Sequence, residues 1–302
     1  MVIETENLTK NYGNKRGCQN ISISVNNGEI FGFLGPNGAG KSTFIKMMTG
    51  LLFPTSGSAA ILGKPLGDVS VRKKIGYLPE NFKYQDWMTG EDLLSFHSSL
   101  FKMEKKNVKK RIQEVLSLVK LTGNEKYKIG TYSKGMQQRL GLASALLTDP
   151  ELLFLDEPTS ALDPIGRKEV RDIMLDLKRR GKTVLLNSHL LSEVEMVCDS
   201  AAIINKGSVI AQGSMSDMLQ GEQVIDIHAE NLSDELIREL RNISPNLELM
   251  NNRIKMSVKT KEDVHKIASI IIQMGGKLYE LIPHGQNLES KFISLIEGGE
   301  FK

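Results

Sequence analysis

A glycine-rich stretch near the N-terminus has the residue types and the spacing of a phosphate-binding loop. Residues 35–43 read GPNGAGKST, which fits the pattern G-x-x-x-x-G-K-[ST]. Glycines let successive backbone N–H groups converge on phosphate oxygens, where a Cβ would obstruct them. The lysine would bring a positive charge to the β and γ phosphates, and the serine could ligate Mg²⁺. The sequence therefore predicts a nucleotide site at Gly35, Pro36, Asn37, Gly38, Ala39, Gly40, Lys41, Ser42 and Thr43.

Two carboxylates follow an apolar run later in the chain, in 152-LLFLDEP-158. A continuous apolar run of this length is typical of a parallel strand that is buried on both faces. Asp156 at its end could hold Mg²⁺ beside the phosphate loop, and Glu157 could polarise a water molecule at the γ-phosphate. Without the phosphate loop, an acidic turn at a strand end would be an equally good interpretation.

A histidine and a tyrosine are weaker candidates. His189 ends the apolar run 183-TVLLNSH-189, where a structural role is the commoner one. If the sheet order places this strand at the nucleotide edge, His189 could hydrogen-bond to the γ-phosphate. Tyr12 could stack on a base, but a partly buried surface tyrosine is equally compatible with the sequence. The chain has no N-K-x-D motif for reading guanine, which favours ATP over GTP.

A second helix start with anion-binding character occurs in 132-YSKGMQQRLGLASALL-147. Ser133 is a candidate N-cap, and Gly135 keeps the start of the helix open to a close ligand. The stretch has too few glycines to wrap a triphosphate, but it could cap one from the far side. An ordinary capped helix is the alternative interpretation.

Strand and helix patterns alternate along residues 1–220, which predicts an α/β sheet with crossover helices. Residues 21–25 and 29–34 read as strands, and residues 41–50 read as a helix that ends at Gly50. A helical insertion is expected at about residues 89–147. A boundary near Gly221 precedes the order strand, helix, strand, strand, helix, strand, which is ferredoxin-like. We therefore expect a small α+β accessory domain over residues 221–302, with a last helix at 288–298.

Composition and charge are those of an ordinary globular protein. The 302 residues are 25% charged and 40% hydrophobic, with a formal net charge of +3, so nothing indicates a nucleic-acid partner. The basic run 105-KKNVKKR-111 is best interpreted as a solvated helix face. Cys18 and Cys198 lack metal-ligand spacing, which favours a reducing compartment. The N-terminus is unlike a signal peptide and no apolar run reaches ~18 residues, so we expect membrane contact only through a partner.

Taken together, these motifs resemble the nucleotide-binding subunit of ATP-binding cassette (ABC) transporters over about residues 2–220. The resemblance implies a P-loop NTPase (RecA-like) core with a β-subdomain and the helical insertion. It makes residues 35–43 the Walker A loop, Asp156 and Glu157 the Walker B aspartate and catalytic glutamate, and His189 the switch histidine. It further implies that Tyr12 stacks on adenine.

Three further motifs follow from the same resemblance. Glu80 takes the Q-loop position within 75-IGYLPEN-81 and could ligate Mg²⁺, residues 133–137 resemble the signature motif, and Asp163 ends a D-loop, 160-SALD-163. In this family two subunits pair head to tail, and the signature helix of one closes on ATP held by the other. Ser133 and Gly135 would then act on ATP bound to a second copy, in a symmetric homodimer. ATP hydrolysis would loosen that dimer.

Two departures from the family pattern indicate a particular subgroup of the family. The usual signature is L-S-G-G-Q, whereas residues 132–136 read YSKGM, and Glu80 stands where the Q-loop usually has glutamine. Lys134 adds a positive charge near a triphosphate, and Glu80 adds a negative one. These variants are similar to the bacitracin and daunorubicin export ATPases, which often end in a small accessory domain.

The leading hypothesis is a cytoplasmic ATPase subunit, peripheral on the inner face of the cell membrane, that drives a separate transmembrane permease. The resemblance favours export of a drug, antibiotic peptide, lipid or ion. The permease would dock at about residues 80–105; the candidate contacts are Phe82, Tyr84, Trp87 and Met88, unless these side chains form local core. A soluble ABC ATPase of translation or DNA repair is the alternative, although such proteins tend to carry two cassettes or long coiled coils. Glu157 and His189 argue against a cassette that binds ATP without turnover.

Overall fold

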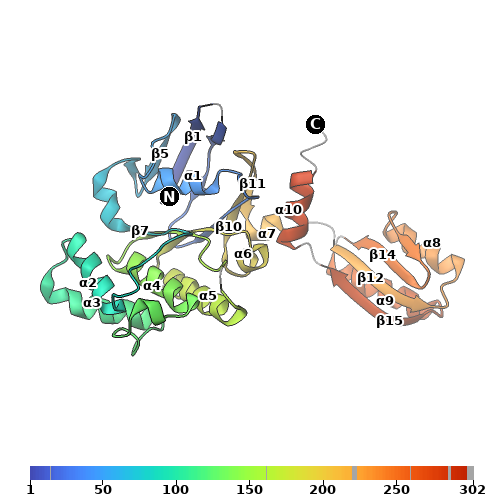
Figure 1. The fold of residues 1–302 in the computed structure, drawn as a ribbon. Helices are drawn as coiled ribbons and strands as arrows, with labels where there is room; N and C mark the ends of the chain where they lie inside the picture. The colour runs from blue at the N-terminus through green and yellow to red at the C-terminus, as the bar shows by residue number, and fades with distance from the viewer. Residues whose placement is uncertain (14, 161, 220–222, 259, 285–286, 298–302) are drawn as a thin grey trace. The chain divides into compact units, whose positions relative to one another are not determined.

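The computed structural model of the protein describes residues 1–302 except for 14, 161, 220–222, 259, 285–286 and 298–302 (Figure 1). The chain divides into two compact units, Met1–Met215 and Ser216–Lys302. Gly221, where the sequence predicts the boundary, lies outside the described residues. In the described part of the chain, no helix is both long enough and apolar enough to cross a bilayer.

A six-stranded sheet forms the centre of the first unit, in the order β11-β10-β4-β9-β8-β7. All neighbours from β10 to β7 are parallel, and β11 is antiparallel to β10. Three central strands are buried along their whole length, which explains their unbroken apolar runs. The bounds are β4 Ile30–Leu34, β7 Ile75–Leu78, β8 Leu152–Asp156, β9 Thr183–Asn187, β10 Ser200–Asn205 and β11 Ser208–Ser214.

A second, antiparallel sheet has the order β2-β1-β5-β6, with β3 paired to β1. The single strand expected at residues 21–25 is wrong: the chain forms β2 and β3 on either side of a break. Strand β2 reads KRGCQNI and lacks the alternation of apolar and polar residues that signals a strand. The segment forms a strand because it pairs with β1. The bounds are β1 Ile3–Tyr12, β2 Lys15–Ile21, β3 Ser24–Val25, β5 Ser56–Ile61 and β6 Lys64–Pro65.

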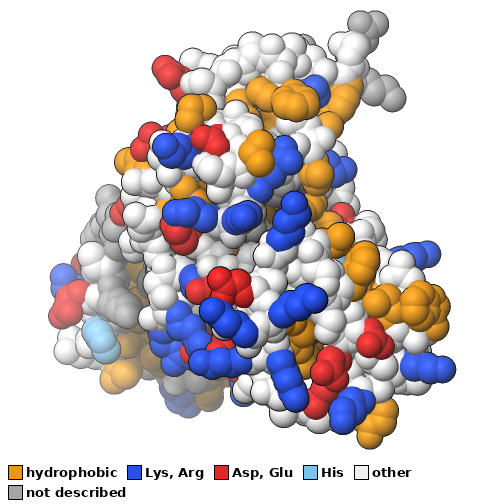
Figure 2. All heavy atoms as spheres, turned by 90° about the vertical axis from the view of Figure 1, so that its left-hand side faces the viewer, with side chains coloured by type: hydrophobic (Ala, Val, Ile, Leu, Met, Phe, Trp, Pro, Cys, Tyr) orange, Lys and Arg blue, Asp and Glu red, His pale blue; other side chains and the backbone are white. Residues whose placement is uncertain are grey.

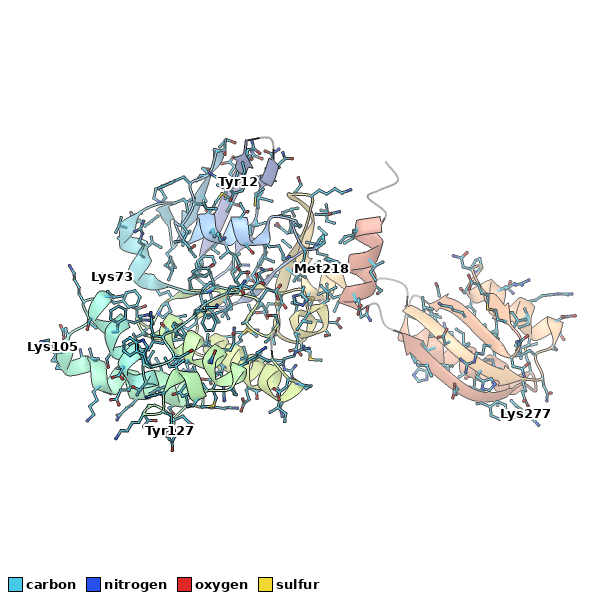
Figure 3. All side chains as sticks on the ribbon, in the orientation of Figure 1. Tyr12, Lys73, Lys105, Tyr127, Met218 and Lys277 are labelled. Atoms are coloured by element: carbon cyan, nitrogen blue, oxygen red, sulfur yellow. The ribbon has the colours of Figure 1, made fainter. Side chains whose placement is uncertain are left out.

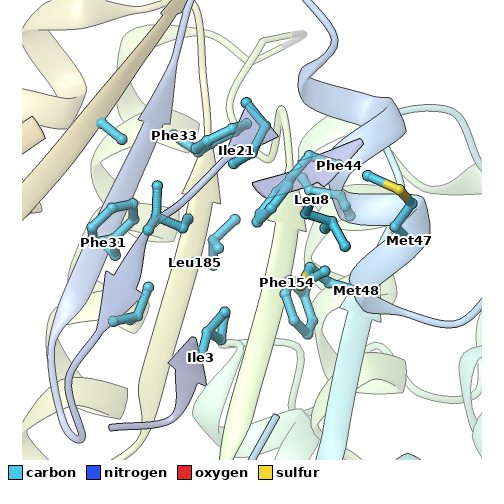
Figure 4. Packing of buried hydrophobic residues seen from close by; sticks show 14 of the residues in the cluster. Ile3, Leu8, Ile21, Phe31, Phe33, Phe44, Met47, Met48, Phe154 and Leu185 are labelled. Atoms are coloured by element: carbon cyan, nitrogen blue, oxygen red, sulfur yellow. The ribbon is translucent and has the colours of Figure 1, made fainter. Parts of the chain in front are cut away.

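Helix α1 (Lys41–Met48) shares one hydrophobic core with both sheets (Figure 4). Phe44 of α1 stacks on Phe33 of β4, with 4.5 Å between ring centroids. Leu8 of β1, Ile21 of β2 and Phe154 of β8 belong to the same cluster. Because its buried face packs on both sheets, the start of α1 is held at the carboxyl edge of the central strands.

Three α-helices make up most of the helical insertion: α2 (Gly90–Leu100), α3 (Lys105–Leu118) and α4 (Lys134–Leu146). A capping box between Thr89 and Asp92 starts α2, and the Ser133 hydroxyl caps α4. The remaining helical elements of the first unit are η1 Val69–Lys74, η2 Ile129–Thr131, α5 Pro164–Arg179 and α6 Leu191–Val197, and α7 Met215–Met218 lies at the unit boundary.

The second unit has its own four-stranded antiparallel sheet, in the order β13-β14-β12-β15. Its core includes Ile225 and Ile227 of β12, Leu236 of α8 and Ile267 of α9, all buried. Helix α8 begins at a Ser233 N-cap, and α9 begins at a Thr260 capping box. The bounds are β12 Gln223–Glu230, α8 Asp234–Ile243, β13 Glu248–Met250, β14 Arg253–Val258, α9 Lys261–Gln273, β15 Lys277–His284 and α10 Leu288–Glu297.

Candidate nucleotide-binding site

The loop between β4 and α1 can follow its path only with glycine at two positions. A Cβ on Gly35 would lie 2.3 Å from the carbonyl oxygen of Ile204. Gly40 has φ +106°, and a Cβ there would lie 2.1 Å from the carbonyl oxygen of Gly17. The first turn of α1 carries no acidic residue and no side-chain cap, so its N-terminal N–H groups are suited to an anion.

Lys41 lies over the loop from which it comes. Its Nζ donates to the carbonyl oxygens of Gly35 at 2.8 Å and Pro36 at 3.1 Å. Burial lowers the pKa of Lys41, while Glu157 and other nearby carboxylates oppose that shift. The ammonium group is therefore held, largely buried, among carbonyl and carboxylate oxygens.

A cavity of about 460 Å³ brings most of the predicted site residues together. The cavity is lined by Tyr12, Gly17, Asn37, Gly38, Gly40, Lys41, Ser42, Thr43, Glu80, Glu157, Asn187 and His189. Gly17 and Asn187 are the two members that sequence reasoning missed. Asn187 could have been noticed as the last residue of an apolar run, and Gly17 as an isolated glycine in a strand.

Asp156 and Asn187 face each other at the ends of β8 and β9. The two residues are paired in the parallel register, and Asn187 Nδ2 donates to Asp156 Oδ1. The Asp156 carboxylate is buried, and within the described residues the Asn187 Oδ1 is buried without a hydrogen-bond partner. A buried carboxylate beside an unfilled oxygen acceptor, with the Ser42 hydroxyl and Glu80 in reach of the same cavity, fits a hard cation such as Mg²⁺.

Glu157 is turned into the cavity by a left-handed backbone, with φ +53°. Its N–H donates to the carbonyl oxygen of Asn187 at 2.9 Å, and its Oε2 lies 2.7 Å from His189 Nδ1. A carboxylate can only accept, so the Nδ1 of His189 is the donor. Burial raises the pKa of Glu157, while His189 and Lys41 pull it back down. The glutamate is therefore a stronger base than one in water, and its orientation is held by His189.

Tyr12 lies at the end of β1, with its side chain 45% exposed (Figure 3). A Cβ on Gly17 would lie 2.9 Å from the ring, so glycine is what lets the ring approach β2. The Lys10 ammonium lies 5.7 Å from the ring centroid. An exposed aromatic face at the rim of the cavity is suited to stacking on a planar base.

Seven predicted residues do not line the cavity. Gly35, Pro36 and Ala39 belong to the loop and Asp156 to the end of β8, whereas Ser133, Gly135 and Asp163 lie elsewhere in the chain. Ser133 Oγ accepts from the N–H of Met136 at 3.2 Å, and Asp163 Oδ1 accepts from the N–H of Gly166 at 2.8 Å, so both cap helices. A Cβ on Gly135 would fit without a clash, because it would make only ordinary van der Waals contacts with Ser133 at 3.8 Å and Leu162 at 3.9 Å. Ala161 of the expected D-loop lies outside the described residues.

The four docking candidates differ in exposure. Trp87 is 71% exposed, whereas Phe82, Tyr84 and Met88 are partly buried. Phe82 packs against Gly141 of α4 and lies 5.1 Å from the ring of Tyr84. Burial raises the pKa of Tyr84 to about 12. Of the two interpretations left open, an exposed contact fits Trp87, whereas the partial burial of Phe82, Tyr84 and Met88 fits a local core, in which Phe82 packs onto α4.

Comparison with known proteins identifies the family. The ABC transporter family model matches residues 18–160. An uncharacterized ABC transporter ATP-binding protein of Nostoc sp. (strain PCC 7120) is 39% identical, over 93% of this chain and 83% of that protein. This chain belongs to the ATP-binding proteins of ABC transporters. Among its relatives, the bacitracin transport ATP-binding protein BcrA of Bacillus licheniformis is 34% identical over 99% of this chain and 98% of its own length.

The cassette also resembles solved structures. One is the dimeric post-hydrolysis state of the ATP-binding cassette MJ0796 bound to ADP and phosphate, with a TM-score of 0.64 and 25% identity. The match covers 70% of this chain and 98% of that one. The protein is thus an ATP-binding, ATP-hydrolysing subunit of an ABC transporter with an α/β P-loop NTPase fold. The relatives favour this function over that of a soluble ATPase in translation or DNA repair.

Proposed function

We propose that the cavity beside α1 binds Mg-ATP and that the residues lining it hydrolyse the γ-phosphate. The observation that carries this proposal is that one cavity contains the glycine loop, Lys41, Glu157 and His189. The loop N–H groups and Lys41 would hold the phosphates, and Tyr12 would stack on adenine. Pro36 and Ala39 would shape the loop without lining the cavity.

The hydrolytic step follows from the contact between Glu157 and His189. Glu157 would accept a proton from a water molecule aimed at the γ-phosphate. With both ring nitrogens protonated, His189 would keep that carboxylate in position through Nδ1 and donate to the phosphate from Nε2. Asp156, Ser42 and Glu80 would hold Mg²⁺, which when bound neutralises charge on the β and γ phosphates.

The site would be completed by a second copy of the chain. Ser133 and Gly135 lie outside the cavity, and the missing side chain of Gly135 would let a ligand held by another molecule approach the start of α4 closely. The dimeric cassette MJ0796 supports a paired state. Asp163 would lie near the junction of the two copies, where it holds the start of α5.

A substitution that stops turnover tests this proposal. Glu157→Gln should keep ATP binding but lower the hydrolysis rate by about 10²–10⁴-fold, since a general base contributes about that much. With ATP no longer consumed, light scattering in saturating Mg-ATP should find a dimer. A monomer under these conditions would contradict the shared site. Ser133→Arg in the same background should restore the monomer, because the substitution places a bulky cation in the interface between the two copies.

We further propose that this subunit is peripheral on the inner face of the cell membrane and powers a separate permease for export. The similarity to the bacitracin transport protein supports export, with a drug, antibiotic peptide, lipid or ion as the class of substrate. Trp87 and the start of α2 would form the docking surface. Co-purification with a six-span membrane protein encoded beside this chain would test the assignment.

The second unit would be a ferredoxin-like accessory domain, extending over about residues 221–302. Its order of strands and helices and its sheet order β13-β14-β12-β15 support that fold. Solving the structure of the purified unit by NMR would test the arrangement.

A further inference from the structure

The corner between α2 and α3, defined as residues 96–110, exposes apolar and basic side chains together. Phe96, Leu100 and Phe101 are 52%, 63% and 42% exposed. Glu104 is the one acidic residue in the corner, so its net charge is strongly positive. Five lysines follow the apolar group: Lys102, Lys105, Lys106, Lys109 and Lys110.

The basic side of the corner is not neutralised by the cassette itself. Lys106 pairs with Glu104 at 3.1 Å, and Lys110 lies 3.9 Å from Glu114. Within the described residues, Lys102, Lys105 and Lys109 form no ion pair and are exposed. Lys105 and Lys109 lie on the same stripe of α3 as Ile112 and Leu116 but in its first two turns, before the part of the helix that buries Ile112, Val115 and Leu116, and there they are exposed.

Lys102 occupies a backbone position that favours glycine. It has φ +54° and ends α2, with its N–H donating to the Ser99 carbonyl and the N–H of Met103 donating to the Ser98 carbonyl. Glycine is the usual residue at this position of the motif, because a Cβ is strained there. The chain thus carries a lysine where backbone conformation disfavours it.

The corner belongs to a broader basic side of the first unit. In Figure 3, Lys105 lies at the outer edge of the helical insertion and Lys73 of η1 lies on the same side. Figure 2 looks onto this side and shows Lys and Arg side chains spread across it, with hydrophobic, Asp and Glu side chains among them.

We propose that the α2–α3 corner binds the anionic lipid headgroups of the membrane surface directly. Exposed lysines beside large apolar side chains suit an interface where phosphates lie above acyl chains. A single strand of nucleic acid instead prefers a basic groove that follows its backbone, whereas this corner protrudes from the insertion. The proposal rests on the peripheral location proposed above, and it adds a lipid contact to the expected contact through the permease.

Vesicle binding by the full chain tests the proposal. The wild-type protein should co-sediment with vesicles of 30% phosphatidylglycerol in phosphatidylcholine, and less with phosphatidylcholine alone. The triple variant Lys102→Gly, Lys105→Gln and Lys109→Gln should bind about a hundredfold more weakly, since each lysine near an anionic surface contributes about fivefold. Lys102→Gly also removes the strain of a side chain on a left-handed backbone, so we do not expect weaker vesicle binding to come from loss of folding.

A matched control exists at the other end of α3. Lys120 is also left-handed, with φ +57°, and Lys126 and Lys128 are exposed near Tyr127, which lies on another edge of the unit in Figure 3. Lys120→Gly, Lys126→Gln and Lys128→Gln should leave vesicle binding unchanged. Equal weakening in both triple variants, or equal binding to both kinds of vesicle, would overturn the proposal.

Two more measurements separate the remaining explanations. Displacement of the wild-type protein from anionic vesicles by a 20-nucleotide polyuridine at equal phosphate concentration would assign the corner to nucleic acid instead. ATP hydrolysis should be the same in the wild type and the α2–α3 triple variant without vesicles. Absent hydrolysis in both would refute the proposed site, whereas normal hydrolysis without vesicle binding would refute only the lipid contact.

Discussion

At the scale of single residues, the site depends on charges that are held largely out of water. Lys41, Asp156 and Glu157 are 7%, 3% and 7% exposed. Burial of a lone charge is costly, so these groups are tolerated because each one has an opposite charge or a hydrogen-bond partner nearby. The same burial lowers the pKa of Lys41 and raises that of Glu157, which makes the roles of these two residues testable one at a time.

Lys41→Ala should lower ATP affinity by roughly 10- to 100-fold, because a charge-assisted hydrogen bond contributes about 1.5–3 kcal/mol. Lys46→Ala is the matched control, since Lys46 is exposed on the same helix and does not line the cavity. Titration with a fluorescent ATP analogue measures both variants. Equal affinities for the two variants would exclude Lys41 from phosphate binding.

The raised pKa of Glu157 predicts a pH dependence of the turnover rate. The general base must be a carboxylate, and this form is lost as the pH falls through the raised pKa. The rate should therefore fall on the acid side at a higher pH than an ordinary glutamate would give. His189 lowers that pKa, so His189→Gln should raise the pH at which the turnover rate falls on the acid side. An unchanged pH of this fall would contradict the pairing of His189 with Glu157.

The same shift predicts an effect on stability. A carboxyl whose folded pKa is raised loses stability as the pH rises from its unfolded to its folded pKa. Glu157→Gln removes a charge that burial disfavours, so thermal unfolding without nucleotide should occur at a higher temperature at pH 7 than in the wild type. At a pH below the unfolded pKa the difference should vanish. A lower melting temperature at pH 7 would contradict net destabilisation by burial.

At the scale of elements, α4 shows two glycines with opposite roles. A Cβ on Gly141 would lie 2.8 Å from Leu78 of β7 and 2.9 Å from the Phe82 ring, so the helix packs on the sheet through this position. Gly135 at the other end of α4 meets no such obstruction. Close packing explains the first glycine, whereas the packing of the chain does not require the second, to which we assign the proposed contact with a second copy of the chain.

This contrast predicts different effects of the same substitution. Gly135→Ala should leave the folded state intact, since alanine favours a helix by up to about 1 kcal/mol, and should lower turnover about 10- to 100-fold. Gly141→Ala should destabilise the protein by about 1–3 kcal/mol through overpacking. Urea unfolding and phosphate release measure the two effects. Full turnover in Gly135→Ala would show that Ser133 and Gly135 only form the capped start of a helix.

At the scale of the whole molecule, each unit encloses its own core. The cluster around Phe33 and Phe44 belongs to the first unit, and the cluster around Ile225 and Leu236 belongs to the second. Every residue that lines the nucleotide cavity lies in the first unit. A ligand bound there should therefore stabilise one unit and leave the other unaffected.

Calorimetry should find two unfolding transitions. ATP with Mg²⁺ at about a hundred times its Kd adds about 2.7 kcal/mol to the first unit, which corresponds to roughly 5–10 °C for a unit of this size. The second transition should not move, and it should reappear in the separate fragment 216–302. The Glu157→Gln variant is suited to the measurement because it does not consume ATP. A single transition that shifts as a whole would show that the units unfold together.

Much of this protein could be predicted from its sequence, because much of it depends on neighbours in the chain. The loop at 35–43 requires glycines and a lysine at set spacing, and residues 152–155 and 184–186 are apolar because their strands are buried on both faces. Periodicity indicates the helices in the same way. These patterns are local, so the motifs, the ABC transporter family and the alternation of strands and helices around the central sheet could be inferred without coordinates.

Only the tertiary structure decided which of these residues meet. The order β4-β9-β8 brings Asn187 against Asp156 and His189 against Glu157, 32 residues apart in the chain. It also placed Gly17 beneath Tyr12, made a strand of the polar β2, and left Ser133 and Gly135 outside the cavity. Strand order and pairing depend on contacts between distant segments, which no local pattern of residue types encodes.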